Sequence, residues 1–267
     1  MDSIDLARRA RKSSLEMVHN AGASHIGSAL SMIDIVAVLY SDIMNIFPND
    51  PSNKDRDRLI LSKGHACVGI YSVLGNLDFF PSEMLLEYGK NESILMNHIS
   101  HKVPGVEFST GSLGHGLSFG VGKALAAKKM KSSWKTFVIL SDGELQEGSN
   151  WEAFMFSAFH NLSNLVAVID FNNLQSLTTV DKTLGVEPLD KKLESFGWNV
   201  ITVNGHNHEE LRQSLKKACN EKLRPTVIIA NTIKGKGVSF MENKVEWHYK
   251  TPSKDELIQA IAEIESA

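Results

Sequence analysis

Cysteine is scarce in this chain of 267 residues, which has only Cys67 and Cys219. Two cysteines this far apart can build neither a disulfide framework nor a zinc-type cluster. Charge of one sign is not in excess, because 28 lysines and arginines stand against 31 aspartates and glutamates. No stretch gathers more than a few basic residues, which argues against a nucleic-acid surface or a membrane-binding face.

Long apolar runs are also lacking, since none approaches the roughly 20 residues that a membrane-spanning helix needs. The amino-terminal stretch 1–22 carries three acidic residues beside its arginines, whereas many targeting peptides are poor in acidic residues. Its apolar residues, among them Ile4, Ala7 and Leu15, recur at helical spacing. We therefore expect an amphipathic helix of the mature protein and a cytoplasmic location.

Two kinds of apolar segment alternate along the chain. Continuous runs typical of parallel strands buried on both faces lie at 136–140, 165–170, 198–203 and 226–231. Segments of helical character lie at 28–44, 64–77, 110–130, 149–161 and 207–220, the third of them opening as a glycine-rich loop. This order predicts a doubly wound α/β fold, with a mainly parallel sheet and helices on both faces. Without a repeat or linker, residues 1–267 are expected to form one domain.

Polar turns follow two of the predicted strands. Asp142 and Gly143 come directly after the strand 136–140, in a turn that we expect to face solvent, and Asn172 lies 30 residues beyond Asp142. That spacing is about one βαβ unit, so the two turns should meet at neighbouring strand ends, where open parallel sheets bind ligands. Either turn alone would more often be structural, because Asp and Asn are common turn formers. Together their oxygens suit Mg²⁺ or Ca²⁺ bound to a phosphate-bearing ligand.

The segment "SDGELQEG" (141–148), followed by Asn172, resembles the thiamine diphosphate motif of transketolases. Other transketolase-like segments follow in the family's order: "HIGSALSMIDIVAVLY" (25–40), "LSKGHACVGIY" (61–71), "PGVEFSTGSLGHGLSFGVG" (104–122), "TIKGKGVSF" (232–240) and "EWHYKTPS" (246–253). The resemblance covers only the amino-terminal, diphosphate-binding domain of full-length transketolases. The chain thus resembles the amino-terminal subunit of a split transketolase.

This resemblance implies two cofactors, thiamine diphosphate and a divalent cation, Mg²⁺ or Ca²⁺. The metal would be held by Asp142, the amide of Asn172 and the backbone carbonyl of Leu174. Thiamine diphosphate would be contacted by His65, Gly111, Leu113, Gly143, Asn172 and His248. The catalytic residues implied are His25, His65, His98, Glu147 and His248.

Imidazoles suit this chemistry, because each half of a ketol transfer moves a proton at oxygen near neutral pH. Glu147, in the same resemblance, would reach a subunit interface and join a carboxylate network that links paired active sites. The histidines His19, His160, His206 and His208 are instead expected at helix ends or on the surface. The methionines Met17, Met32, Met84 and Met155 are expected in the core.

The implied function is transfer of a two-carbon ketol unit from a ketose or ketose phosphate to an aldose. A carboxy-terminal transketolase subunit would supply the missing pyrimidine-binding and third domains, in an α₂β₂ assembly. Two other enzymatic functions use the same cofactor: a 2-oxoacid decarboxylating synthase or lyase, and a specialised ketol transferase of a secondary or cell-surface sugar pathway. Departures from the family's usual residues, such as His115 in place of glutamine, favour the specialised enzyme. A subunit that only stabilises its partner is disfavoured by the intact metal motif.

Overall fold

The computed structural model describes residues 1–266, in which five strands form one sheet in the order β1-β2-β3-β5-β4. Every neighbouring pair is parallel. The strands are β1 (Arg58–Leu61), β2 (Thr136–Ser141), β3 (Leu165–Phe171), β4 (Asn199–Asn204) and β5 (Thr226–Asn231). The predicted parallel α/β fold is confirmed, with the four predicted strands displaced by no more than one residue at either end.

The fifth strand, β1, was missed by the sequence prediction. It has only four residues and follows a highly charged segment, so no apolar run of the usual length marks it. It pairs with β2 from Arg58 opposite Thr136 to Leu61 opposite Ile139. This strand matters for the site because its carboxyl end adds a further segment to the edge where the other strands end.

The helices agree with the predicted segments and include three that were not predicted, α6, α7 and α9. The α-helices are α1 (Ser3–Ala21), α2 (Ile26–Val38), α3 (Cys67–Asn76), α4 (Gly116–Met130), α5 (Gly148–Phe159), α6 (Val180–Leu184), α7 (Leu189–Ser195), α8 (His208–Asn220) and α9 (Lys254–Ser266). Short 3₁₀ or π segments are η1 (Leu39–Ile43), η2 (Gly64–Ala66), η3 (Ser82–Glu87), η4 (Gly143–Gln146) and η5 (Val245–His248).

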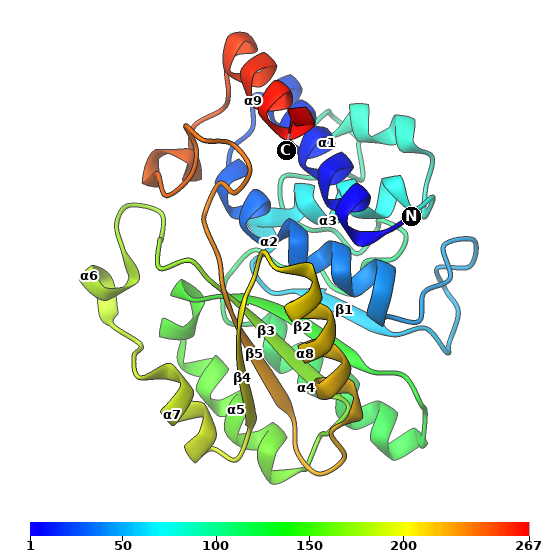
Figure 1. Ribbon diagram of the computed structural model, residues 1–267. Helices are drawn as coiled ribbons and strands as arrows, with labels where there is room; N and C mark the ends of the chain where they lie inside the picture. The colour runs from blue at the N-terminus through cyan, green and yellow to red at the C-terminus, as the bar shows by residue number, and fades with distance from the viewer. Residues whose placement is uncertain (267) are drawn as a thin grey trace.

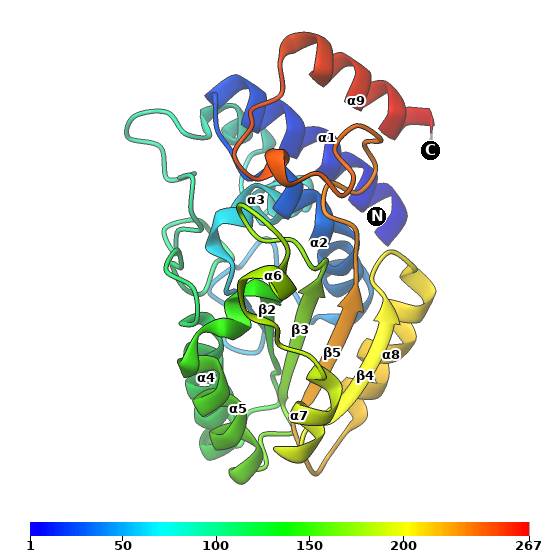
Figure 2. The same cartoon turned by 90° about the vertical axis from the view of Figure 1, so that its left-hand side faces the viewer.

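Helices cover both faces of the sheet (Figures 1 and 2). One apolar cluster joins one face of the strands with residues of α1, α2, α3, α8 and α9, in which α9 packs on α1, and the other joins the opposite face with α4, α5 and α7. Along β2, Phe137 and Ile139 belong to the first apolar cluster, whereas Val138 and Leu140 belong to the second. Successive side chains point to opposite faces, so a strand covered on both sides is apolar throughout.

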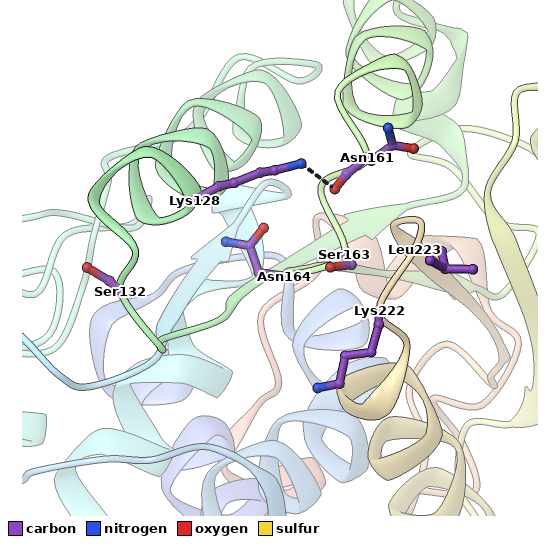
Figure 3. Close-up of a pocket in the computed structure, with 7 residues that line it drawn as sticks. All are labelled: Lys128, Ser132, Asn161, Ser163, Asn164, Lys222 and Leu223. Carbon is purple, nitrogen blue, oxygen red and sulfur yellow. Dashed lines mark hydrogen bonds between the residues drawn. The ribbon is translucent and has the colours of Figure 1, made fainter.

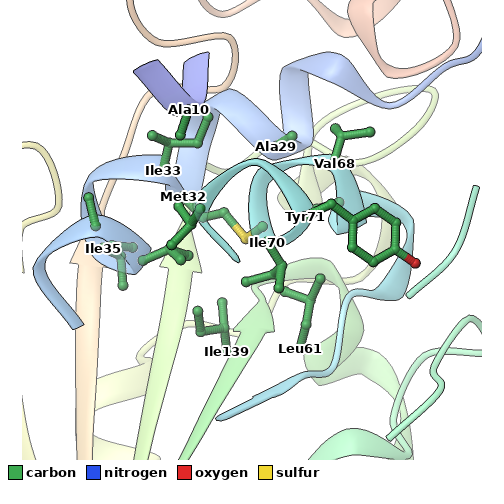
Figure 4. Close-up of a cluster of buried hydrophobic side chains, with 14 of the residues drawn as sticks. Ala10, Ala29, Met32, Ile33, Ile35, Leu61, Val68, Ile70, Tyr71 and Ile139 are labelled. Carbon is green, nitrogen blue, oxygen red and sulfur yellow. The ribbon is translucent and has the colours of Figure 1, made fainter. Parts of the chain in front are cut away.

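Helix α2 is the central helix of the first face, and all of its residues are buried. Together with η1 it makes the segment Ile26–Ile43, which is the one helix of residues 1–266 long and apolar enough to cross a membrane. The prediction that no apolar run approaches the length of a membrane-spanning helix therefore does not hold for this segment. The segment is 83% buried inside the protein, and Figure 4 shows α2 side chains packed with those of α1 and α3. It is a core helix.

The apolar stripe expected along α1 is present, but Ile4 lies outside it. Ile4 is 68% exposed, whereas Leu6, Ala7 and Ala10 are buried. One predicted core residue lies on the surface instead. Met155 is 49% exposed on α5, whereas Met17 and Met32 are buried as predicted. Helical spacing identifies an apolar stripe without fixing which of its edges meets the core.

Two glycines of α4 provide a test of how closely this helix packs on β2. A methyl group at Gly120 would lie 2.4 Å from Cγ2 of Val138, whereas one at Gly122 would meet nothing within 4 Å. We expect Gly120→Ala to lower the free energy of unfolding by about 1–3 kcal/mol through overpacking. Gly122→Ala should raise it by about 0.5–1 kcal/mol through helix propensity. Urea denaturation measures both, and equal effects would contradict the packing described.

Candidate functional site

Four neighbouring strands of the sheet end at one cavity. Lys63 and His65 follow β1, Asp142 follows β2, Asn172 follows β3 and Lys234 follows β5. All five residues line a cavity of about 260 Å³. Its position at the carboxyl ends of parallel strands is where this class of fold binds ligands.

The cavity brings together the predicted site residues with one exception. Its lining includes His25, His65, His98, Gly111, Leu113, Asp142, Gly143, Asn172, Leu174 and His248. The exception is Glu147, which is exposed immediately before α5. It packs against Gly114, where an added methyl group would lie 2.7 Å from Cβ of Glu147. Glu147 thus borders the loop that carries Gly111 and Leu113.

Asp142 is buried, with 1% of its surface exposed, so the prediction of a solvent-facing turn is wrong. One carboxylate oxygen accepts a hydrogen bond from the N–H of Gly143 at 2.7 Å, and the other accepts from the N–H of Asn173. Burial, and next the nearby carboxylate of Asp170, raise the pKa of Asp142 to about 6. A buried carboxylate beside a second one fits a position that a cation would stabilise.

The turn after β3 holds the amide that was predicted beside this carboxylate. The Asn172 side-chain oxygen accepts from the N–H of Leu174 at 3.0 Å, and its nitrogen donates to Oγ of Ser31 at 3.0 Å. Over residues 1–266 no three His, Cys, Asp or Glu side chains gather as a metal site. A cation here would instead take one carboxylate, an amide oxygen, a backbone carbonyl and oxygens of its own ligand, as Mg²⁺ commonly does.

Two buried lysines complete the cavity, and neither was predicted from the sequence. Lys63 pairs with the carboxylate of Asp170. The Lys234 ammonium donates to the carbonyls of Leu174 at 3.2 Å and Gln175 at 2.8 Å. Burial, and next the charge of Lys63, lower the pKa of Lys234 to about 8. Each lysine follows shortly after a strand end, which is the signal that identified Asp142.

A buried donor and a close backbone approach give this cavity the character of an anion site. Within the described residues, the side-chain nitrogen of Gln175 is buried without a hydrogen-bond partner. Leaving such a donor unpaired costs about 1–3 kcal/mol, which an anion accepting from it would offset. At Gly143 an added methyl group would lie 2.9 Å from Cγ of Gln175, so a side chain there would crowd the cavity. These features fit a diphosphate between the two lysines.

Four imidazoles converge at the same cavity. The ring of His25 lies 5.1 Å from that of His65, 5.9 Å from His98 and 5.0 Å from His248, measured between centroids. Lys234 donates to Nδ1 of His248 at 3.0 Å, which leaves Nε2 of that ring as the N–H. The predicted cluster of His25, His65, His98 and His248 is therefore present as one group.

Burial holds three of these imidazoles in the neutral form. The pKa of His25 falls to about 4 because of burial and then the charge of His98. The pKa of His248 falls to about 3 because of burial and then the charge of Lys234. Burial, with Lys63 next, holds the pKa of His65 well below its ordinary value. Neutral imidazoles at pH 7 can accept protons from a bound hydroxyl group.

The four histidines that were predicted at helix ends or on the surface divide into two pairs. His19 lies in the last turn of α1 and His160 follows the last residue of α5, as predicted. His206 and His208 were predicted at helix ends or on the surface, but their side chains are only 11% and 12% exposed. Both contact the buried carboxylate of Asp34. No spacing along the chain connects them to Asp34, which comes from α2.

A larger cavity, of about 470 Å³, lies near the opposite, amino-terminal ends of the strands (Figure 3). Its lining residues are Lys128, Ser132, Asn161, Ser163, Asn164, Lys222 and Leu223. The Lys128 ammonium donates to the carbonyls of His160 at 2.8 Å and Asn161 at 3.1 Å. Its lining offers neither a carboxylate nor an imidazole, so the chemistry of the first cavity has no counterpart here.

The family model for the thiamine diphosphate binding domain of transketolase matches residues 3–264. The chain belongs to this family. The transketolase resemblance inferred from the motifs is confirmed, and thiamine diphosphate is the ligand that characterises the domain.

Curated relatives and solved structures agree with this assignment. The chain is 39% identical over 258 residues to one subunit of the apulose-4-phosphate transketolase of Phocaeicola vulgatus, covering 97% of this chain and 92% of that one. It is 37% identical over 266 residues to a 6-deoxy-6-sulfo-D-fructose transketolase subunit of Clostridium sp. strain MSTE9, covering 98% and 97%. The crystal structure of transketolase from Campylobacter jejuni superposes with a TM-score of 0.93 at 31% identity. The chain is covered to 98% in that comparison but spans 42% of the Campylobacter protein.

The neutral imidazoles predict a pH dependence of stability. A histidine whose pKa is lower in the folded protein binds its proton in the unfolded chain first, so stability is lost as pH falls from about 6.5 toward 4. We expect His25→Asn to make this loss smaller, and asparagine tolerates the positive φ of 72° found at this position. Urea denaturation at pH 7 and pH 5 measures the difference. His160→Asn serves as the control, and an equal pH response of the two variants would contradict the prediction.

Proposed function

We propose that this chain is the diphosphate-binding subunit of a thiamine diphosphate-dependent transketolase. The reaction transfers a two-carbon ketol unit from a ketose or ketose phosphate donor to an aldose acceptor. One observation carries the proposal: the carboxylate of Asp142, the amide of Asn172 and four imidazoles line the same cavity. Relatives that match over nearly their whole length and are named as transketolase subunits support it.

The metal of this proposal is Mg²⁺ or Ca²⁺, held by Asp142, the amide oxygen of Asn172 and the carbonyl of Leu174. All three are hard oxygen donors from the ends of adjacent strands. The carbonyl of Leu174 accepts one hydrogen bond from Lys234 and keeps a second lone pair for the cation. The nearby lysines then face the phosphates that complete the shell.

Thiamine diphosphate would be contacted by His65, Gly111, Leu113, Gly143, Asn172 and His248. Lys63, Lys234 and the unpaired side-chain nitrogen of Gln175 supply positive charge and a donor for the diphosphate. When bound, this cofactor supplies the electron sink that stabilises a carbanion. The chain itself orients the cofactor and handles protons.

The proposed catalytic work of the imidazoles is proton transfer at oxygen. Donor cleavage removes the proton from the hydroxyl group beside the C–C bond that breaks. Acceptor addition returns a proton to the carbonyl oxygen of the incoming aldose. The rings of His65, His98 and His248 lie 5.0–5.9 Å from that of His25, so the four imidazoles line the same part of the cavity. A neutral imidazole there can do both.

A partner subunit is the second part of the proposal. We propose that residues 1–267 form one diphosphate-binding domain and that a carboxy-terminal transketolase subunit supplies the pyrimidine-binding and third domains, as α₂β₂. Support comes from α5, on which Met155, Phe156 and Phe159 are 49%, 43% and 81% exposed. Exposed apolar side chains toward the carboxyl end of α5, the helix that Glu147 precedes, fit a surface covered by a partner. We propose that Glu147 meets partner groups at the other end of this helix. The cytoplasmic location stays a prediction from the sequence.

The proposed ketol transferase and the alternative enzymes differ in their substrates. A decarboxylating synthase or lyase would act on a 2-oxoacid, whereas clustered imidazoles favour a donor with several hydroxyl groups. Relatives named for apulose-4-phosphate and for 6-deoxy-6-sulfo-D-fructose favour a specialised sugar pathway. We therefore place ketol transfer on an uncommon sugar or sugar phosphate ahead of the decarboxylase.

Asp142→Asn tests the metal site. The amide keeps one oxygen acceptor for the backbone but removes the negative charge, so we expect the affinity of the assembled enzyme for thiamine diphosphate with Mg²⁺ to fall about 100-fold. Calorimetry measures it. Asp190→Asn, on the exposed first turn of α7, is the matched control. Unchanged affinity in Asp142→Asn would remove this carboxylate from the metal site.

Reconstitution tests the proposed function as a whole. The chain alone should show no ketol transfer, and mixing with the carboxy-terminal subunit should produce it with a ketose donor and no release of CO₂ from pyruvate. Coupled assays of aldose release and of CO₂ separate the two reactions. Robust transfer by the isolated chain would contradict the divided site, and decarboxylation of pyruvate without ketol transfer would favour the alternative enzyme.

A further inference from the structure

A buried carboxylate lies outside the cavity and has no part in the proposed chemistry. Asp34, in α2, is 5% exposed and lies within hydrogen-bond distance of three side chains. Nη2 of Arg11 lies 2.6 Å from it, Nδ1 of His206 2.7 Å and Nε2 of His208 3.0 Å. These partners come from α1, from the turn after β4 and from the start of α8. The cluster therefore joins α2 to α1, to the turn after β4 and to α8.

His206 connects this carboxylate to the loop that follows β5. Its Nε2 lies 2.8 Å from the backbone nitrogen of Ile233. A backbone N–H can only donate, so Nε2 must accept and Nδ1 must carry the proton that points to Asp34. The imidazole is thus a neutral bridge with a fixed tautomer, oriented by the carboxylate as in other Asp–His pairs.

Arg11 holds the same loop farther along. Its Nε donates to the carbonyl of Lys236 at 3.2 Å. The N–H of Gly235 donates to the carbonyl of Gly27 at 3.0 Å, at the start of α2. The backbone is consequently fixed on both sides of Lys234, by His206 before it and by Arg11 and Gly27 after it.

The side chain of Lys234, in contrast, makes its contacts inside the cavity. It reaches the carbonyls of Leu174 and Gln175 and Nδ1 of His248. His206 lies outside the lining of that cavity and borders a separate one of about 820 Å³. The bond to the backbone of Ile233 is the contact that connects His206 to the loop carrying Lys234.

We propose that His206 is a positioning residue of the cofactor site. Through its bond to Ile233, backed by Asp34, it fixes the backbone that aims Lys234 at the metal loop and at His248. The consequence for cofactor affinity rests on the proposed function, whereas the fixing of the loop does not.

Two substitutions at one position separate the bond to Ile233 from the bond to Asp34. His206→Asn can keep a donor near Nδ1 but is too short to accept from Ile233, whereas His206→Gln can place its oxygen near Nε2. His208→Gln is the matched control, because His208 contacts Asp34 and Ser3 but not the loop.

Hydrogen exchange at residues 232–237 of the purified chain is the first readout. We expect His206→Asn to accelerate exchange of the Ile233 amide at least 10-fold, His206→Gln to restore much of the protection, and His208→Gln to leave it unchanged. In the assembled enzyme with Mg²⁺, the affinity for thiamine diphosphate should fall about 10-fold in His206→Asn alone. Calorimetry measures this second readout.

Unchanged exchange at Ile233 in His206→Asn would overturn the proposal, and so would equal acceleration in His208→Gln. A wild-type enzyme that does not bind thiamine diphosphate would refute the proposed function, while the exchange data still decide the role of His206. The ¹⁵N shifts of His206 in the wild-type chain need no variant. They should show protonation at Nδ1, and a proton on Nε2 would overturn the proposal even if His206→Asn fails to fold.

Discussion

The buried ion pair between Lys63 and Asp170 is the interaction on which the site depends. Asp170, at the end of β3, also accepts hydrogen bonds from Ser31 of α2 and Thr232 after β5, and from the amide of Asn172. One carboxylate thereby joins β1, β3, β5 and α2 at the mouth of the sheet. Removing one partner of such a pair typically costs about 3–5 kcal/mol, because the other charge stays buried and unpaired.

Neighbouring groups in the cavity depend on this arrangement. Burial is the main cause of both pKa shifts, and Lys63 further lowers the pKa of Lys234 while Asp170 further raises that of Asp142. Each half of the pair therefore acts on a residue of the proposed metal–diphosphate site. The imidazoles respond to the same lysines, since the charge of Lys234 contributes to the low pKa of His248. Two carboxylates, two lysines and the neutral imidazoles therefore influence one another within one cavity.

Much of this architecture was predictable from the sequence. The apolar runs of β2, β3 and β5 indicated the parallel sheet, and Asp142 and Asn172 at their ends indicated the location of the cavity. Strand β1 was not predictable in the same way, since four residues carry too little periodicity. Helical spacing also misplaced Met155, because spacing alone does not show which edge of an apolar stripe meets the core.

Contacts between distant segments account for most of what the sequence did not reveal. His208 does begin a helix, as one of the predicted alternatives had it, but nothing local connects Asp34 with His206 and His208, so their shared contact with this carboxylate was not predicted. Likewise, the solvent-facing turn expected for Asp142 is covered by the loop that carries Asn173 and Gln175. The residue types Asp and Gly predicted a turn there. The burial of the Asp142 side chain, however, depends on segments from elsewhere in the chain that pack over this turn.

The strand order also governs when the protein can fold during its synthesis. Strand β4 pairs only with β5, which leaves the ribosome after it, and the N–H of His25 bonds to the carbonyl of His248 near the end of the chain. A nascent chain that ends before residue 226 therefore presents β4 without a neighbour and β3 with one open edge. Open edges of this kind are templates for pairing with other chains. The sheet can therefore be completed only after β5 has emerged, and until then the edges of β3 and β4 must be kept from pairing with other chains.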